Sequence, residues 1–205
     1  MTAARTVRIG ITGPIGCGKS QVGRWLAERG ALVVDADHVA REVTAPGTPV
    51  HTEILRRFGA AVTAADGTLD RAALGRVVFA DPAELRDLEA LVHPAVRPRI
   101  LELIAEAEAE APPAVVIEAI KLVEGGLADL CDEVWLVTCD PSAQRERLLA
   151  RGTPASEADQ RIAAQAEISE RLLPSATRVL DTSGGAGETR RAVESAFEAA
   201  LASAG

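Results

Sequence analysis

The residues from Gly13 to Ser20 have the types and spacing of a phosphate-binding loop. They read Gly13-Pro14-Ile15-Gly16-Cys17-Gly18-Lys19-Ser20 and fit the pattern G-x-x-x-x-G-K-S/T. Glycines allow backbone conformations in which successive amide groups point at phosphate oxygens, and the N-terminus of a following helix adds a favourable dipole. Lys19 can bridge the β- and γ-phosphates of a nucleoside triphosphate, and Ser20 can ligate Mg²⁺. The loop therefore predicts a nucleotide site.

The segments on both sides of this loop have the periodicity of a strand and of a helix. Before it, apolar side chains alternate from Val7 to Ile11, as they do in a strand. After it, apolar residues recur at helical spacing from Val22 to Leu26, and Gly30 is expected to end that helix. A position between a strand and a helix is the context in which this pattern binds phosphate. The alternative, a glycine-rich turn with an exposed lysine, requires no such flanking elements.

Further apolar runs along the chain are typical of buried strands. They lie at residues 32–34, 115–117, 134–137 and 178–180. Helical segments separate them, so the sequence predicts an α/β fold of three layers, in which helices cover both faces of a parallel five-stranded sheet. The interval 36–111 is too long for one crossover helix. We therefore expect one domain with its core at about 7–35 and 113–205 and a helical insertion at about 36–111.

Capping signals locate the ends of several predicted helices. Asp81-Pro82 is typical of a helix start, because aspartate caps well and proline fits the first helical position. Pro94 is expected to begin a new helix that continues to Ala111. Ser156 and Asp159 have the spacing of a capping box.

The composition is that of a globular chain with an excess of acidic residues. The 205 residues are 47% hydrophobic and 25% charged, with a formal net charge of −8, so disorder is excluded and neither a nucleic acid nor a membrane is an expected partner. There is no signal-peptide stretch and no run of about 18 apolar residues, which predicts a cytoplasmic protein. The three cysteines are widely spaced, so we expect neither a disulfide framework nor a zinc site.

Among proteins with such a loop, the sequence favours a kinase of small metabolites. The guanine-reading motif N-K-x-D of GTPases is absent. The segment from Val34 to Arg41, Val-Asp-Ala-Asp-His-Val-Ala-Arg, resembles the D-A-D-x-x-A-R motif of dephospho-CoA kinases. Further matches to that family follow in order: Pro46-Gly47, Phe58-Gly59, Asp66-Gly67, Leu69, Arg71, Leu74, Phe79, Leu88-Glu89, His93-Pro94, Glu124, Gln144, Arg147, Arg151 and Gln165.

The resemblance covers residues 10–184 and implies a P-loop kinase fold. It implies transfer of the γ-phosphate of ATP to the ribose 3′-hydroxyl of dephospho-CoA, which gives coenzyme A, with Mg²⁺ as cofactor. The insertion at about 36–111 would bind the acceptor. The ATP-binding residues would be Gly13, Pro14, Ile15, Gly16, Cys17, Gly18, Lys19, Ser20, Arg147 and Arg151. One departure is that Thr182-Ser183-Gly184 stands where the family often has Asn before the glycine.

Two carboxylates follow the second predicted strand, where ligands of parallel sheets gather. They are Asp35 and Asp37, and either could accept a proton from a hydroxyl group or cap the next helix. The residues alone leave both assignments open, and the resemblance implies that Asp37 is catalytic. Arg41 lies one helical turn later and would bind the acceptor, with a surface ion pair as the alternative.

Arg147 and Arg151 are four residues apart and so share one helical face. Phosphoryl transfer spreads negative charge over the γ-oxygens, and the forked guanidinium group of arginine matches that charge. Gly152-Thr153-Pro154 follows Arg151, which predicts a lid at about 147–170. For Arg147, a solvated helix position is an equal alternative. The expected catalytic residues are therefore Lys19, Asp37 and Arg151.

Several other residues have two interpretations. Glu118 ends the strand predicted at 115–117 and could contact the water shell of Mg²⁺, or be a plain loop carboxylate. His93 precedes a proline and is expected to shape a helix junction or to contact the acceptor, rather than to act as a base. Surface positions are expected for His38 and His51, and core positions for Trp25 and Trp135.

Two other functions are compatible with the phosphate loop. One is another small-metabolite or nucleoside kinase, and the other is a nucleotide-binding module without turnover. Asp37 and the lid arginines argue against the module, because binding alone requires neither a carboxylate on the acceptor side nor a lid.

Overall fold

The computed structural model describes residues 5–203, which divide into two compact units. The first unit contains the chain up to Asp35 and from Ile104 onward, and the second contains Ala36–Leu103. The long helix α5 (Pro82–Ala109) belongs partly to each. Among the described residues, none of the helices combines the length and the apolar character that a membrane span needs.

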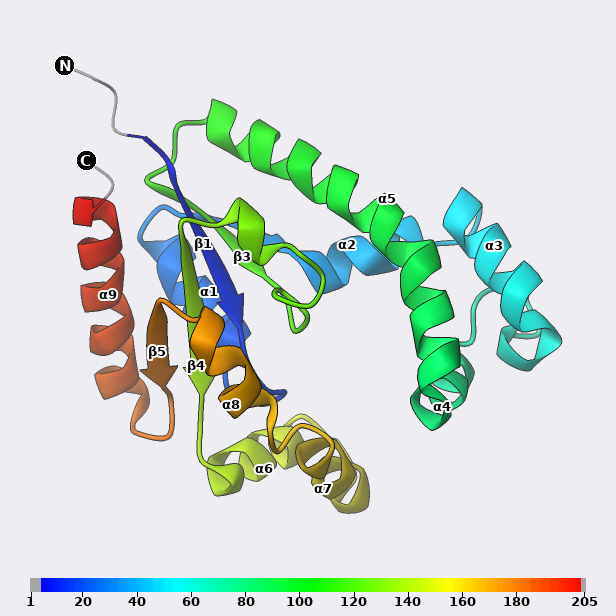
Figure 1. Cartoon of the computed structure of the whole chain (residues 1–205). Coiled ribbons are helices and arrows are strands. Elements are labelled where there is room, and N and C mark those ends of the chain that lie inside the picture. Colours follow the sequence, from blue (N-terminus) through cyan, green and yellow to red (C-terminus); the bar gives the residue numbers. More distant parts are fainter. Residues whose placement is uncertain (1–4, 204–205) are drawn as a thin grey trace. The chain divides into compact units, whose positions relative to one another are not determined.

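A parallel five-stranded sheet forms the centre of the first unit (Figure 1). Its strands in spatial order are β2 (Leu32–Asp35), β3 (Ala114–Glu118), β1 (Val7–Thr12), β4 (Glu133–Thr138) and β5 (Arg178–Asp181). The three central strands are almost wholly buried, which explains their continuous apolar runs. Each strand predicted from the sequence is confirmed, with bounds that agree within one residue.

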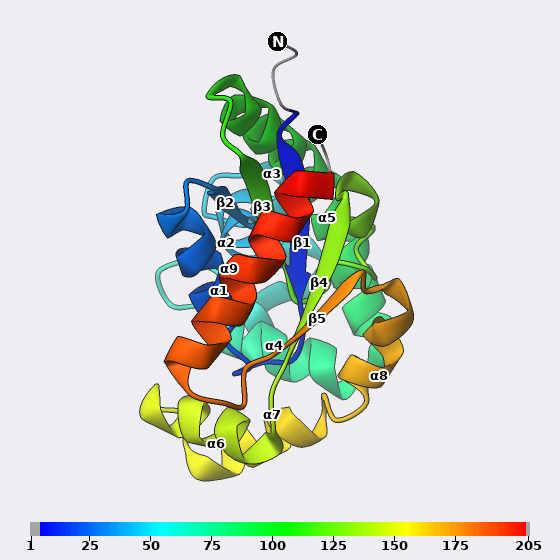
Figure 2. The ribbon, with the colours of Figure 1, turned by 90° about the vertical axis from the view of Figure 1, so that its left-hand side faces the viewer.

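Helices cover both faces of this sheet (Figure 2). On one face, α1 (Lys19–Glu28) and α9 (Ala186–Ser203) pack over a core that contains Trp135 of β4. The next residue, Leu136, belongs to the opposite face and packs against α8 (Ile168–Leu172). Successive side chains of a strand point to opposite faces, so β4 contributes to both cores. Both tryptophans are core residues, as predicted.

Short elements complete the first unit. They are η2 (Ala128–Leu130), α6 (Pro141–Ala150), α7 (Ala155–Ala163) and η3 (Leu173–Ser175). The predicted capping box at Ser156 is wrong, because α7 begins one residue earlier and no side chain caps it. Asp159 instead accepts a hydrogen bond at 2.7 Å from Arg145 of α6, so its carboxylate serves an ion pair between the two helices.

The second unit is helical throughout, as predicted for this part of the chain. Besides the first part of α5, it contains α2 (Ala36–Val43), α3 (Pro49–Phe58), η1 (Gly59–Val62) and α4 (Arg71–Ala80). Its core centres on Ile54, Val62, Leu74 and Val78. His51, which was expected at the surface, is only 7% exposed. It lies three residues before Ile54, so helical periodicity places it on the apolar face of α3.

The predicted helix junction at Pro94 is wrong, because α5 is continuous through Pro94 and Pro98. Both prolines are exposed and lie four residues apart, on one side of the helix. Water can therefore satisfy the carbonyl groups that lose their helical partners. Val96 and Ile100 are buried on another side of the helix. Ala109 ends the helix, two residues before the predicted end.

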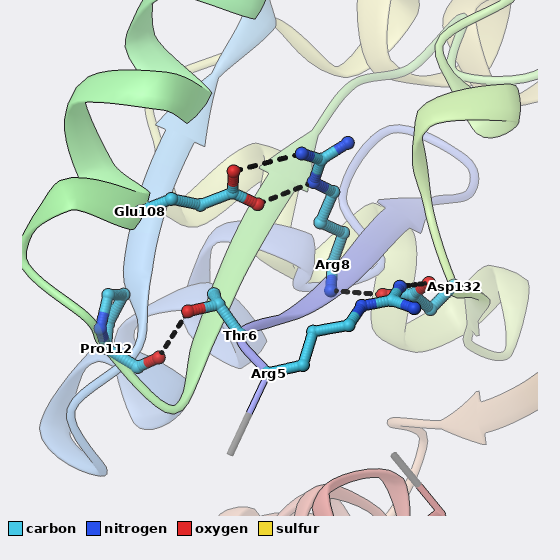
Figure 3. A network of polar contacts seen from close by, with 6 residues as sticks. All are labelled: Arg5, Thr6, Arg8, Glu108, Pro112 and Asp132. Atoms are coloured by element: carbon cyan, nitrogen blue, oxygen red, sulfur yellow. Dashed lines mark hydrogen bonds and ion pairs between the residues drawn. The ribbon is translucent and has the colours of Figure 1, made fainter. Parts of the chain in front are cut away.

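The start of β1 is anchored by ion pairs to two distant segments (Figure 3). The guanidinium of Arg8 donates to both carboxylate oxygens of Glu108, at 2.7 and 3.0 Å, near the end of α5. The backbone amide of Arg8 donates to Asp132 at 2.8 Å, and Arg5 pairs with the same carboxylate. These contacts fix the strand whose opposite end leads into the phosphate loop.

A second polar cluster links β4 to β5. Arg178 donates to both carboxylate oxygens of Glu133, at 2.8 and 3.0 Å, and the indole of Trp135 donates to the same carboxylate at 2.6 Å. The Glu133 side chain is only 15% exposed. The hydrogen bond from Arg178 lowers the pKa of Glu133, so the charged form of this carboxylate stabilises the fold.

We predict that Glu133→Gln lowers the free energy of unfolding by about 1–2 kcal/mol at pH 7. A carboxyl with a lowered folded-state pKa contributes stability that is present above its unfolded pKa of about 4.3 and is lost as pH falls through the folded value. The difference between wild type and variant should therefore shrink below about pH 4. Urea denaturation at pH 7 and below about pH 4 measures this difference in the free energy of unfolding. The exposed Glu110→Gln is the control. An equal difference at both pH values would contradict the charge-based account.

Candidate active site

The loop Gly13–Ser20 connects β1 to α1, so the strand–loop–helix context predicted from the sequence is present. The φ angles are +139° at Gly13, +79° at Gly16 and +89° at Gly18, a region that residues with side chains rarely adopt. Gly13 also has no room for a side chain. A Cβ atom there would lie 2.1 Å from the carbonyl oxygen of Val137 in β4, so the loop packs directly on the sheet.

Two glutamines from later segments hold the loop at Ile15. The Gln144 side-chain amide donates to the Ile15 carbonyl oxygen at 2.6 Å, and the Ile15 amide donates to the Gln165 side-chain oxygen at 2.7 Å. Gln144 is buried in α6, and Gln165 follows α7. The sequence matches both residues to the family pattern without indicating their role. Their contacts span 129 and 150 residues, so only the folded chain shows them.

Lys19 is 7% exposed and bends back over the loop. Its Nζ donates to the carbonyl oxygens of Gly13 and Pro14, at 2.8 and 3.0 Å. At the first turn of α1, the hydroxyl of Ser20 donates to the carboxylate of Glu118 at 2.7 Å. Glu118 ends β3, the strand beside β1. A hydroxyl and a carboxylate are oxygen ligands of the kind that Mg²⁺ prefers, so this pair is suited to that ion.

Arg147 is clamped between the phosphate loop and the end of β5. Its guanidinium donates to the hydroxyl and the carbonyl oxygen of Thr182, at 2.9 and 2.5 Å, and to the Gly16 carbonyl oxygen at 3.5 Å. The Thr182 hydroxyl in turn donates to the carbonyl oxygen of Cys17 at 2.8 Å. The solvated position considered for Arg147 is therefore wrong. All of these acceptors are neutral, so the side chain is held in place without losing its charge.

A pocket of about 480 Å³ opens beside the N-terminus of α1. Its lining residues are Gly18, Gln21, Arg24, Trp25, Arg147, Arg151, Thr182, Gly184, Ala186 and Thr189. The lining contains three arginines and no carboxylate, so the pocket is suited to an anionic ligand of nucleotide size.

Arg151 lies at the C-terminal end of α6 and lines this pocket. Its side chain forms no ion pair with any of residues 5–203. The next residue, Gly152, has φ +82°, which allows the chain to turn sharply from α6 into α7. Arg145 and Arg161, the weaker candidates, pair with Asp159 and Glu157. Arg151 is thus the charged group of this turn that is open to a ligand.

The expected acceptor-side residues belong to the second unit. Asp37 lies in the first turn of α2, and Arg41 lies in the last turn. Both are exposed, and His93 is exposed on α5. Asp35 ends β2 and is in register with Glu118 of β3, in the first unit. The first unit thus brings together the loop, Glu118, Arg147 and Arg151, whereas Asp37, Arg41 and His93 belong to the other unit.

Within residues 5–203, a single disulfide joins Cys17 of the phosphate loop to Cys139 after β4, a bond that the cysteine spacing did not indicate. The two residues are 122 positions apart in the chain, but their Cα atoms are 5.2 Å apart. The cause is the sheet topology, because β1 and β4 are neighbours and their carboxyl ends meet at one edge. Cys131 is the free thiol among the described residues, and burial raises its pKa to about 12.

Comparisons with known proteins agree with this geometry. The family model for dephospho-CoA kinase matches residues 7–188. A dephospho-CoA kinase of Symbiobacterium thermophilum is 46% identical over 198 residues, covering 96% of this chain and 82% of the relative. A crystal structure of a Thermus thermophilus protein superimposes with a TM-score of 0.78 at 36% identity, covering 95% and 98% of the two chains. Dephospho-CoA kinase from Campylobacter jejuni has a TM-score of 0.67 at 22% identity, covering 93% and 95%, and shows the same fold.

We predict that Cys139→Ser lowers the free energy of unfolding by about 2–4 kcal/mol under oxidising conditions, because it removes a cross-link that restricts the unfolded chain. After reduction with dithiothreitol, variant and wild type should unfold at similar denaturant concentrations. Chemical denaturation with and without the reductant measures both values. A wild type that is indifferent to reduction would contradict a stabilising role for the bond.

Proposed function

The chain belongs to the dephospho-CoA kinase family, and we propose that its phosphate loop, Asp37 and Arg151 carry out the transfer. The reaction moves the γ-phosphate of ATP to the ribose 3′-hydroxyl of dephospho-CoA and gives coenzyme A. The observation that carries the proposal is the glycine loop at the N-terminus of α1, beside a pocket that is lined by arginines and contains no carboxylate.

ATP binds with its phosphates against the loop amides and its nucleoside in the 480 Å³ pocket. Lys19 exchanges the carbonyl oxygens of Gly13 and Pro14 for the β- and γ-phosphates. Arg147 is already oriented by Thr182 and Gly16, so it binds the nucleotide without losing side-chain freedom at that step. It therefore contributes to ATP binding, as the loop residues do.

Ser20 and Glu118 would hold Mg²⁺, the Ser20 hydroxyl directly and the Glu118 carboxylate through the water shell of the ion. The 2.7 Å contact between their oxygens supports this assignment, because it places both groups at one point beside the phosphate loop. When bound, Mg²⁺ neutralises charge on the β- and γ-phosphates.

On the acceptor side, Asp37 accepts the proton of the 3′-hydroxyl. As the bond from the 3′-oxygen to the γ-phosphorus forms, the bond from that phosphorus to the β–γ bridging oxygen breaks, and ADP leaves. Asp37 follows β2 by two residues, so chain connectivity keeps its Cα within about 7 Å of that of Asp35. The carboxyl ends of parallel strands are where ligands of such sheets bind.

Two segments of the chain then bind the two substrates. The helical segment at about 36–111 binds the acceptor, with Arg41 and His93 as contacts, and the segment at about 147–170 forms a lid over ATP. The lid assignment is supported by the turn at Gly152 and by the Arg145–Asp159 ion pair, which links α6 to α7.

We predict that Asp37→Asn lowers kcat by about 10²-fold or more, because the amide cannot accept the hydroxyl proton, and leaves ATP affinity nearly unchanged. ADP release with ATP, Mg²⁺ and a panel of acceptors that includes dephospho-CoA measures this and tests the proposed substrate. Asp35→Asn is the matched variant. Loss of turnover in Asp35→Asn with normal turnover in Asp37→Asn would reverse the assignment of the base.

We predict that Arg151→Ala lowers kcat more than it raises KM for ATP. A lid arginine contacts the γ-phosphate mainly as charge redistributes during the transfer. Its removal therefore destabilises the transition state more than the complex with bound ATP. Arg151→Lys keeps the charge but not the planar fork, and should restore only part of the rate. Steady-state kinetics and thermal melts measure this, with the exposed Arg191→Ala of α9 as control. Unchanged kcat in both Arg151 variants would exclude the lid role.

A further inference from the structure

A pair of neighbouring arginines in the second unit has no acidic partner. Arg71, the first residue of α4, donates from its guanidinium to the Thr44 hydroxyl at 2.9 Å and to the Arg41 carbonyl oxygen at 3.2 Å. The Thr44 hydroxyl itself donates to the Ala40 carbonyl oxygen at 2.7 Å, and Thr44 is only 4% exposed. The Arg71 guanidinium is therefore fixed against the C-terminal end of α2 by neutral oxygens.

The charge of this pair is not cancelled within the described part of the chain. Neither Arg41 nor Arg71 forms an ion pair with any of residues 5–203. Burial and the nearby positive charge of Arg41 lower the pKa of Arg71, so the two cations repel each other. Two arginines of the same unit are paired, Arg56 with Glu53 and Arg57 with Glu84 and Asp87, whereas Arg76 and Arg86 form no ion pair with any of residues 5–203. An anion between Arg41 and Arg71 would remove the repulsion.

The position of the pair relative to Asp37 suggests which anion binds there. Arg41 follows Asp37 by four residues on α2, a rise of about 6 Å along the same helical face. In dephospho-CoA, the ribose that carries the reacting 3′-hydroxyl also carries the diphosphate, on its 5′-carbon. A few covalent bonds separate the hydroxyl from the first phosphate, so both can contact one face of a short helix.

We propose that Arg41 and Arg71 form a binding site for the 5′-diphosphate of the acceptor, one helical turn from the base, which rests on the role proposed above for Asp37. The two forked cations can each take two phosphate oxygens, which suits a diphosphate. Binding there holds the ribose in one orientation relative to Asp37. Arg71 is thus a binding and specificity residue that selects acceptors with a charged 5′-group.

The test compares two acceptors in Arg71→Ala and Arg41→Ala. With dephospho-CoA, each variant should raise the acceptor KM roughly tenfold to a hundredfold and leave the KM for ATP unchanged. With adenosine, which has the 3′-hydroxyl but no diphosphate, the same variants should change the rate little relative to wild type. Arg71→Lys should restore part of the affinity for dephospho-CoA. The exposed, ion-paired Arg56→Ala is the control from the same unit.

A loss that is equal for both acceptors, or an unchanged KM for dephospho-CoA, would overturn the proposal. Arg41→Ala guards against a folding defect, because the Arg41 guanidinium makes no hydrogen bond among residues 5–203. Calorimetric binding of dephospho-CoA to Asp37→Asn, with and without Arg71→Ala, separates this site from the proposed base. Affinity that depends on Arg71 while Asp37→Asn turns over normally would refute the base and support the anion site.

Discussion

A loop that binds phosphate with its backbone amides can use few of them to hold itself together, and here the Cys17 amide contacts the Pro14 carbonyl oxygen while the Ile15 amide contacts Gln165. In this chain, the consequence is that other segments must fix the loop. Gly13 lies directly on the Val137 carbonyl of β4, and Gln144 and Gln165 hold the backbone carbonyl oxygen and the backbone amide of Ile15. The order of the strands in the sheet makes the Gly13 contact possible, because it places β4 beside β1.

The structure uses arginines in two different ways. Where an arginine stabilises the fold, its partner is a carboxylate, as in Arg8 with Glu108 and Arg178 with Glu133. Where we propose that an arginine binds a ligand, its hydrogen-bond partners are neutral: Arg147 donates to Thr182 and Gly16, and Arg71 to Thr44 and a main-chain carbonyl. Neutral acceptors set the direction of the guanidinium and leave its charge for an anion.

Local features of this fold are readable from the sequence, and contacts between distant segments are not. The glycine loop, the strands, the end of α1 near Gly30 and the start of α5 at Asp81-Pro82 depend on residues within a few positions, so their patterns predicted them. The clamp of Thr182 on Arg147, the glutamine contacts to Ile15 and the Cys17–Cys139 disulfide arise only once the sheet has formed. Pro94 misled for another reason. The effect of a proline inside a helix depends on whether water can reach the carbonyl group that loses its N–H partner. The sequence alone does not show whether that side of the helix is exposed to solvent.

Both proposed substrates are polyanions, yet the chain has a net charge of −8. The net negative charge does not prevent these polyanions from binding, because solvent-exposed charges are largely screened beyond about 8 Å at physiological ionic strength. A phosphate bound between Arg147 and Lys19, or between Arg41 and Arg71, is therefore attracted by its neighbours and is little affected by distant carboxylates. Binding depends on where the cations lie rather than on their number, and Arg147, Arg41 and Arg71 form no ion pair with any of residues 5–203.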